Sequence, residues 1–189
     1  MTITIWSDIR CPFCYIAKRK LENAILQFEH KEKINLEWKS VELDTNLKTN
    51  LNINTIDHYI SKGGNKQQIT DLFSNATNMA KDVGIDFDLN NIIVANSFKA
   101  HKLVHIAKRV NKQSDAKEAL LKAYFSDGKN IDDTKVLLKI GHDLGLKQEE
   151  IENDLTRETL DYKVRQDQEL ADKLGISGVP FFIFNNKYS

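Results

Sequence analysis

Residues Cys11-Pro12-Phe13-Cys14 follow the apolar stretch Ile3-Thr4-Ile5-Trp6, and they contain the only two cysteines of the chain. Residues 2–6 alternate in the manner of a short strand, and residues 12–29 carry apolar side chains at helical spacing. Pro12 suits the first turn of a helix, where a missing N–H costs no hydrogen bond. A CxxC pair between a strand and a helix is typical of a thiol–disulfide redox site.

The two cysteines are expected to have different roles. At the start of a helix, unpaired backbone N–H groups and the positive end of the helix dipole stabilise a negative sulfur at Cys11. Such surroundings lower a thiol pKa from about 8.5 to roughly 3.5–7.5. Cys14 lies one turn further along and is expected to be less exposed. We therefore predict that Cys11 is the nucleophile and that Cys14 is the resolving thiol.

The charge balance argues against two classes of partner. The chain has 189 residues, and its 27 basic side chains balance its 27 acidic ones, so that the net charge is zero. A neutral chain has no long-range attraction for nucleic acid or for anionic membranes. We therefore expect neither of them as a partner.

The N-terminus and the cysteine count predict a location. Residues Met1–Ile5 lack the basic and apolar regions of a signal peptide, and no apolar stretch is long enough to span a membrane. Two cysteines cannot build a disulfide framework of the kind found in small secreted proteins. We therefore expect a cytoplasmic protein, in which a CxxC is catalytic, redox-sensing or metal-binding.

The remaining pattern divides the chain into a few segments. Residues 34–42 alternate as a second strand, and the order strand–helix–strand predicts parallel pairing through a right-handed crossover. Residues 44–55 are polar and rich in asparagine, which predicts a linker. Residues 56–173 are almost entirely of helical period, with a last helix over 156–174. A strand is expected at Phe181–Phe184, followed by a hairpin turn.

A second interpretation of the CxxC pair is half of a zinc site. His101 and His105 are four residues apart and would lie on one helical face, which makes them the candidate partners. Lys102 stands where the protease motif HExxH requires a glutamate. We favour no metal site. The histidine pair is then either a partly exposed helix face, or His101 faces the cysteines and tunes the thiolate.

Gly178-Val179-Pro180 is a second signal, because it directly precedes the strand Phe181–Phe184. Proline removes a hydrogen-bond donor from a sheet, so its place at the entry of a buried strand needs an explanation. Either Pro180 is a trans-proline at the strand entry, or it is a cis-proline in a tight turn that faces the CxxC.

The CxxC, the long helical segment and the late GVP together resemble the DsbA family of thioredoxin-fold oxidoreductases. Residues 96–103 and 124–131 resemble its FrnE-like branch, which is similar to 2-hydroxychromene-2-carboxylate isomerases. This resemblance implies an α/β thioredoxin fold interrupted by a large all-helical insertion. The thioredoxin domain would span 1–45 and 166–189, and the insertion 46–165.

The resemblance also implies the site. Cys11 would be the nucleophile and Cys14 the resolving cysteine, while a cis Val179–Pro180 loop would receive the substrate backbone. Phe13, Val179 and Phe181 would give the site an apolar surround, which suits peptides, small disulfides and aromatic molecules alike. No cofactor is implied beyond the redox-active disulfide, although glutathione fits as a co-substrate.

The end of the chain departs from the family pattern. Family members continue past the hairpin turn into another strand and a helix that covers the sheet, and these have no counterpart before Ser189. The strand Phe181–Phe184 would then expose an edge and an apolar face. We expect either a shortened chain or a homodimer in which a second copy covers that edge.

Three functions are compatible with these features. The leading hypothesis is a cytosolic dithiol–disulfide oxidoreductase that acts on protein or small-molecule thiols and disulfides. The second is a glutathione-dependent isomerase or transferase of the kappa type, although such enzymes use a lone serine or similar residue instead of a complete CxxC. The third is a redox sensor without turnover, in which the Cys11–Cys14 disulfide changes the affinity for a partner.

Overall fold

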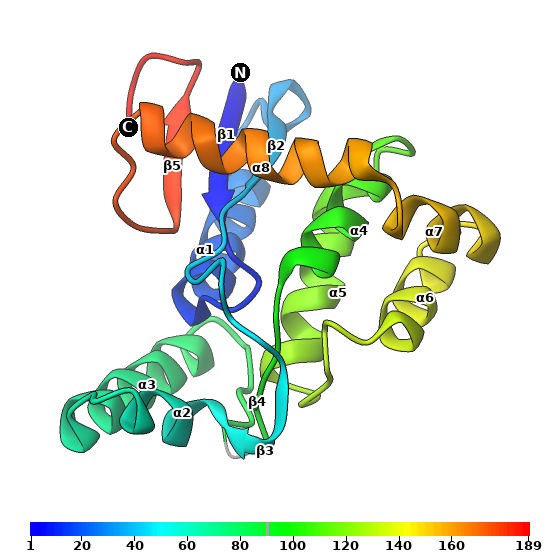
Figure 1. The fold of residues 1–189 in the computed structure, drawn as a ribbon. Helices are drawn as coiled ribbons and strands as arrows, with labels where there is room; N and C mark the ends of the chain where they lie inside the picture. Colours follow the sequence, from blue (N-terminus) through cyan, green and yellow to red (C-terminus); the bar gives the residue numbers. More distant parts are fainter. Residues whose placement is uncertain (90) are drawn as a thin grey trace.

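A small central sheet places the end of the first strand beside the start of the first helix (Figure 1). The computed structural model describes residues 1–89 and 91–189. Within them, β1 (Thr2–Ser7) is the middle strand of a sheet with the order β2-β1-β5. β2 (Asn35–Ser40) pairs with it in parallel and β5 (Phe181–Phe184) in antiparallel orientation. The parallel pairing predicted for the first two strands is therefore confirmed.

Helices cover both faces of this sheet. Figure 1 shows α8 (Glu158–Lys173) crossing one face of β1 and β2, with α1 (Pro12–Gln27) behind them. Five of the six residues of β1 are buried as a result. Apolar burial of this kind contributes about 25 cal/mol per Å² and explains why the central strand carries large residues such as Ile3, Ile5 and Trp6.

The segment between β2 and α8 is mostly helical, as predicted. Its elements are β3 (Asn50–Asn54), α2 (Thr55–Ser61), α3 (Lys66–Lys81), β4 (Ile93–Val94), α4 (Phe98–Lys108), α5 (Gln113–Phe125), α6 (Thr134–Asp143) and α7 (Gln148–Leu155); a short 3-10 helix (Lys31–Lys33) precedes β2. The fold is the expected thioredoxin fold with a helical insertion.

The prediction of a linker over residues 44–55 is wrong in its second half. β3 pairs there with β4, a two-residue strand that lies about forty residues further along the chain. The sequence Asn-Leu-Asn-Ile-Asn did not predict this strand, because asparagine is depleted in strands and the pairing partner is remote in the chain. The last helix starts at Glu158 instead of residue 156, because α7 ends just before it.

The chain turns back directly after β5, as predicted. Asn185 and Asn186 have positive φ angles of 51° and 56°, which asparagine tolerates, in the three-residue turn between Phe184 and its bridge partner Tyr188. An apolar groove of about 550 Å³ lies between α1 and β5, lined in part by Leu21 and Phe182. That a second copy covers this edge stays a prediction. No helix in the described part of the chain has the length and apolar character needed to cross a bilayer.

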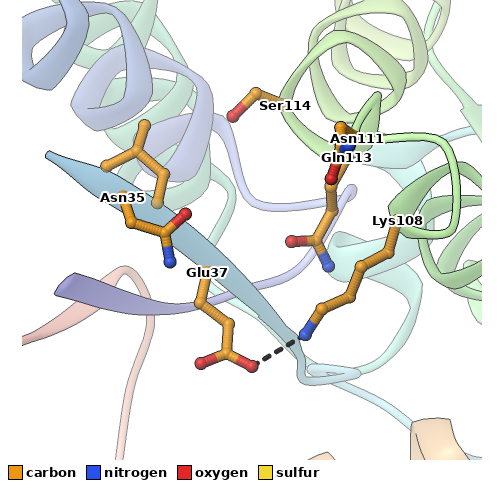
Figure 2. Close-up of a pocket in the computed structure, with 7 residues that line it drawn as sticks. Asn35, Glu37, Lys108, Asn111, Gln113 and Ser114 are labelled. Carbon is orange, nitrogen blue, oxygen red and sulfur yellow. Dashed lines mark hydrogen bonds and ion pairs between the residues drawn. The ribbon is translucent and has the colours of Figure 1, made fainter. Parts of the chain in front are cut away.

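The outer edge of β2 is capped by side chains from the helices. The Gln113 amide accepts a hydrogen bond from Trp38 N (3.1 Å) and donates one to Trp38 O (3.0 Å), as a neighbouring strand would. Asp167 Oδ2 accepts from Ser40 N at 3.0 Å. Beside this edge lies a groove of about 460 Å³, where Lys108 pairs with Glu37 (Figure 2). These contacts satisfy backbone groups that an edge strand otherwise exposes.

Gln113→Leu should destabilise the protein by about 1–3 kcal/mol, because it leaves a buried N–H and a buried C=O of Trp38 without partners. The free energy of unfolding in urea measures the effect. Gln67→Leu, the same substitution at an exposed helical position, is the control and should change stability by less than about 0.5 kcal/mol. Equal stabilities of the two variants would contradict the capping role.

Candidate functional site

The cysteine pair lies where β1 ends and α1 begins. Cys11 is the N-cap residue of α1, and Pro12 occupies its first turn, as predicted. Cys14 N donates to Cys11 O at 3.1 Å, which closes this first turn and places both thiols on it. Both cysteines are free thiols, with 4% of Cys11 and 1% of Cys14 exposed. The nucleophile predicted from the sequence is thus the more exposed of the two, although only slightly.

The surroundings of Cys11 favour its thiolate. A hydrogen bond from the Cys14 thiol lowers the pKa of Cys11 most, burial opposes this, and the backbone N–H groups of Cys14 and Phe13 lower the pKa further. The negative charge of Asp8 works in the opposite direction. The net effect is a Cys11 pKa below its usual value, because donors at a helix start stabilise a negative sulfur.

Cys14 has the opposite tendency. Burial raises the pKa of Cys14 well above its usual value, and the hydrogen bond that it gives to Cys11 adds to this increase. The charge of Lys117 and the backbone N–H of Asp8 act against it. The pair therefore consists of one thiol that ionises readily and one that stays protonated until it reacts, because the two titrations are linked.

The Val179–Pro180 loop lies against the nucleophile. The peptide bond between these residues is cis, and Cys11 Sγ lies 3.5 Å from Val179 O. Val179, Pro180 and Phe13 are all half-buried. The structure thus brings together the two motifs that the sequence singled out, although they are about 170 residues apart. Their contact with a substrate stays a prediction.

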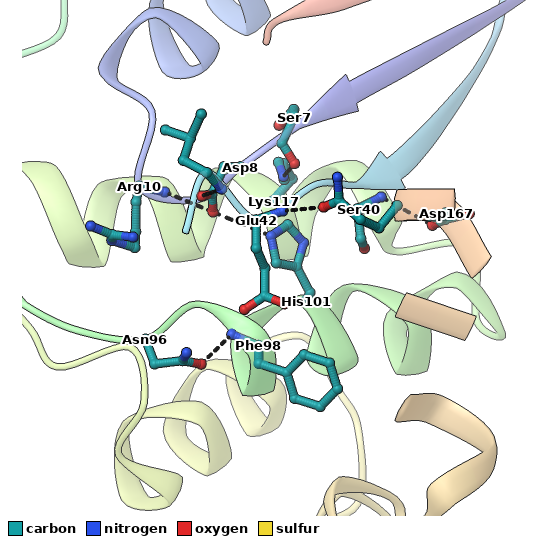
Figure 3. Close-up of polar contacts among 12 residues, drawn as sticks. Ser7, Asp8, Arg10, Ser40, Glu42, Asn96, Phe98, His101, Lys117 and Asp167 are labelled. Carbon is teal, nitrogen blue, oxygen red and sulfur yellow. Dashed lines mark hydrogen bonds and ion pairs between the residues drawn. The ribbon is translucent and has the colours of Figure 1, made fainter. Parts of the chain in front are cut away.

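Asp8, in the loop between β1 and α1, is the centre of a buried polar cluster (Figure 3). Its carboxylate accepts hydrogen bonds from Leu43 N at 2.8 Å and from Arg10 N at 3.2 Å, and it lies 3.3 Å from His101 Nε2. Burial alone would raise the pKa of Asp8, but the hydrogen bond and charge of His101, with Leu43 N–H and Arg10, hold it well below its usual value.

The histidine pair is not the partly exposed helix face that we considered. His101 is fully buried and His105 is 11% exposed, because α4 packs among α5, α7 and α8. His105 Nε2 lies 3.2 Å from Asp167 Oδ2 and 3.2 Å from Ser40 Oγ. Across the described residues, no group of three or more histidine, cysteine or acidic side chains is placed to hold a metal ion.

His101 contacts Asp8 and not a sulfur atom. Burial lowers the pKa of His101, while the hydrogen bond and the negative charge of Asp8, 3.3 Å from Nε2, act to raise it. Its Nδ1 has no hydrogen-bond partner among the described residues. That His101 tunes the thiolate stays a prediction, and Asp8 is the group through which it would act.

The sequence predicted no role for Asp8 or Arg10, and it missed two further buried charged residues of the cluster. Lys117 on α5 donates to Ser7 O at 3.1 Å, and Glu42, just after β2, pairs with Arg165 at 2.6 Å. Burial raises the pKa of Glu42 to about 7, although Arg165 acts against this. A signal for Lys117 exists in the sequence: at helical spacing it shares a face with Leu121 and Tyr124, and a charged residue on an apolar face is informative.

Residues 2–189 match the family model of the DSBA-like thioredoxin domain. The chain belongs to this family. The match covers the N-terminal and C-terminal strands of the sheet and the helical insertion between them. The resemblance of the CxxC and GVP segments predicted this family.

Three similar proteins illustrate the family. The chain is 26% identical to the uncharacterized protein YwbO of Bacillus subtilis over 189 residues, which are 97% of this chain and 86% of that protein. It superposes on probable DsbA oxidoreductase SCO1869 of Streptomyces coelicolor with a TM-score of 0.90, 27% identity, and coverage of 100% and 82% of the two chains. It also superposes on the cytosolic disulfide reductase DsbM of Pseudomonas aeruginosa with a TM-score of 0.70 and 19% identity, over 100% of this chain and 87% of that chain. At this identity the likeness shows the fold alone.

The hydrogen bond between the thiols can be tested with two substitutions of Cys14. Cys14→Ala removes the donor, whereas Cys14→Ser keeps an O–H that can donate to Cys11. The pKa of Cys11, measured from the ultraviolet absorbance of the thiolate, should therefore be higher in the alanine variant than in the serine variant. Equal values in both variants would show that the donor does not determine the acidity of Cys11.

Glu42→Gln should weaken the pH dependence of stability. With a pKa raised from 4.5 to about 7 on folding, Glu42 stabilises the fold at low pH, and this contribution is lost as the pH rises through about 7. The unmodified protein should lose about 2 kcal/mol relative to Glu42→Gln between about pH 5 and about pH 8. Urea unfolding at each pH measures this difference, and exposed Glu149→Gln is the control. Parallel curves for Glu42→Gln and the unmodified protein would contradict the assignment.

Proposed function

We propose that this protein is a thiol–disulfide oxidoreductase. The observation that carries the proposal is the position of Cys11: a free thiol of lowered pKa at the start of α1, 3.5 Å from the carbonyl oxygen of Val179 in the cis-proline loop. A thiolate is the form that attacks a disulfide, and the backbone beside it offers hydrogen bonds to an extended substrate. Membership of the DSBA-like thioredoxin family supports this function.

The reaction has two exchange steps. The Cys11 thiolate attacks a substrate disulfide R–S–S–R, so that a Cys11–S–S–R bond forms and one R–S⁻ leaves. Cys14 then attacks Cys11 Sγ, the bond to the substrate breaks, and the second substrate sulfur leaves with the electron pair. The substrate is thereby reduced to two thiols while the protein is oxidised to its Cys11–Cys14 disulfide. Dithiol oxidation follows the same steps in reverse.

We also propose a reducing compartment and glutathione as a co-substrate. The absence of further cysteines fits the cytosol, where glutathione keeps thiols reduced. DsbM, which shares the fold, is named a cytosolic disulfide reductase and has a structure with glutathione. A complete CxxC pair favours thiol–disulfide exchange over a transferase that only activates glutathione.

Replacement of the nucleophile tests the proposal. Cys11→Ser should reduce the turnover of insulin and of small disulfides to the uncatalysed rate, because the attack on a disulfide requires a thiolate and serine has only a hydroxyl group. Cys14→Ser should still attack but accumulate the mixed disulfide, which mass spectrometry detects as an adduct on Cys11. Turnover by Cys11→Ser at the rate of the unmodified protein would refute the function. Tight glutathione binding to a double serine variant, without any exchange by the native chain, would favour the transferase instead.

A further inference from the structure

Lys117 is a buried charge that the two exchange steps, as described so far, do not use. It lies on α5 in the helical insertion, with only 1% of the residue exposed. Its Nζ donates to Ser7 O at 3.1 Å and lies 5.7 Å from the centre of the Trp38 ring. In the described part of the chain, no carboxylate lies within ion-pair distance of it. An ammonium taken out of water needs compensation, and one carbonyl and one ring supply little.

The other two buried lysines of the described residues, Lys18 and Lys102, make the contrast clear, because each pairs with a carboxylate. Lys18 on α1 is 2% exposed, and its Nζ lies 2.6 Å from Glu22 and 2.7 Å from Glu118. Lys18 thus has the carboxylate partners that a buried cation normally has. An ammonium has three hydrogen-bond donors, and among the described residues Lys117 uses one of them, to Ser7 O. Lys117 can therefore still interact with a nearby anion.

A single peptide group links Lys117 to the resolving cysteine. The carbonyl of Ser7 accepts the hydrogen bond of Lys117, and the N–H of the same peptide unit, that of Asp8, faces Cys14 Sγ. Hydrogen bonds in a chain polarise one another, so a cation on the carbonyl strengthens donation by the N–H. The charge of Lys117 also acts on Cys14 directly. Both effects stabilise a negative sulfur at Cys14.

We propose that Lys117 is a positioning residue for the resolving step, which stabilises the Cys14 thiolate both directly and through the Ser7–Asp8 peptide. This inference rests on the proposed oxidoreductase function. In that step the proton leaves Cys14 Sγ, and the sulfur forms a bond to Cys11 Sγ. The Cys11–substrate bond breaks, and the departing substrate sulfur takes up the proton. No external oxidant or reductant is needed, and the ammonium of Lys117 is unchanged at the end.

The groups around Lys117 link its ionisation to the redox state. Burial lowers the pKa of Lys117 to about 8, while Cys14, Asp8 and Cys11 act to raise it and Lys18 acts to lower it. Lys117 in turn lowers the pKa of His101. Formation of the disulfide removes the negative charge that the pair carries in the dithiol form, which lies on Cys11. The pKa of Lys117 should therefore be lower in the disulfide form than in the dithiol form.

Two substitutions separate the charge from the hydrogen bond. Lys117→Met removes both, whereas Lys117→Gln keeps a donor for Ser7 O without the charge. Lys18→Met is the matched control, because it removes a buried lysine that has carboxylate partners. The substrate is the disulfide of thionitrobenzoate, which releases one coloured thiolate on attack by Cys11 and a second on resolution by Cys14. Stopped-flow absorbance therefore measures both steps in one experiment.

We expect both Lys117 variants to slow the second release about three- to tenfold at neutral pH. The first release should change much less, because Cys11 interacts with Lys117 more weakly than Cys14 does. For each unit by which the pKa of Cys14 rises, its thiolate fraction falls about tenfold and its nucleophilicity increases about threefold, so the net loss is about threefold. Lys18→Met should resolve at the unmodified rate. In a Cys14→Ser background, Lys117→Met should change the rate of attack by Cys11 by less than it changes the resolving step in the native background.

Several results would overturn the inference. It fails if Lys117→Gln resolves normally, or if Lys117→Met and Lys18→Met slow the second step equally, since the role would then be structural. A second measurement needs no variant: the pKa of Lys117 Nζ, followed by nuclear magnetic resonance in the native protein, should differ between the dithiol and disulfide forms. An identical value in both forms refutes the inference. If the native protein releases no thionitrobenzoate at all, the proposed function itself fails, which is a distinct outcome.

Discussion

The buried Asp8 carboxylate is the contact on which the arrangement of the site depends. It accepts hydrogen bonds from the loop after β1, from the loop after β2 and from His101 on α4, and thereby joins three segments that are remote in the sequence. A carboxylate in this position needs all of these donors, because burying a charge is costly unless each lone pair is satisfied. The requirement fixes the loop that leads into Cys11, and with it the position of the nucleophile.

Asp8 also explains why the site balances opposite charges. Its negative charge opposes a thiolate at Cys11, so the lowered pKa of that thiol depends on short-range donors: the Cys14 thiol and the N–H groups of the first helical turn. Lys117 supplies the countercharge, from the opposite side of the Ser7–Asp8 peptide. The pKa values of Cys11 and Cys14 are thus set by charges and hydrogen bonds that act in opposite directions. A small displacement of Asp8 or Lys117 would therefore change them.

The local parts of this arrangement could be predicted from the sequence, and the remote parts could not. Cys11, Cys14 and the start of α1 follow from residues that are neighbours in the chain, and Pro180 stands out because proline is rare before a buried strand. By contrast, Asp8 reads as a loop residue and Lys117 as one lysine among many, because their partners lie about a hundred residues away. The short strands β3 and β4 were not predicted for the same reason, because each forms a strand only by pairing with the other, which is remote in the sequence.

The helical insertion is therefore not an independent module that a thioredoxin domain merely carries. It delivers His101 and Lys117 into the cluster below the cysteines, while Gln113 completes the edge of β2. A chimera that exchanged this segment between relatives would have to bring matching residues at all three positions. The face of the insertion that carries His101, Lys117 and Gln113 is thus constrained by its contacts with the thioredoxin domain. Its solvent-exposed surface has no such constraint from the site.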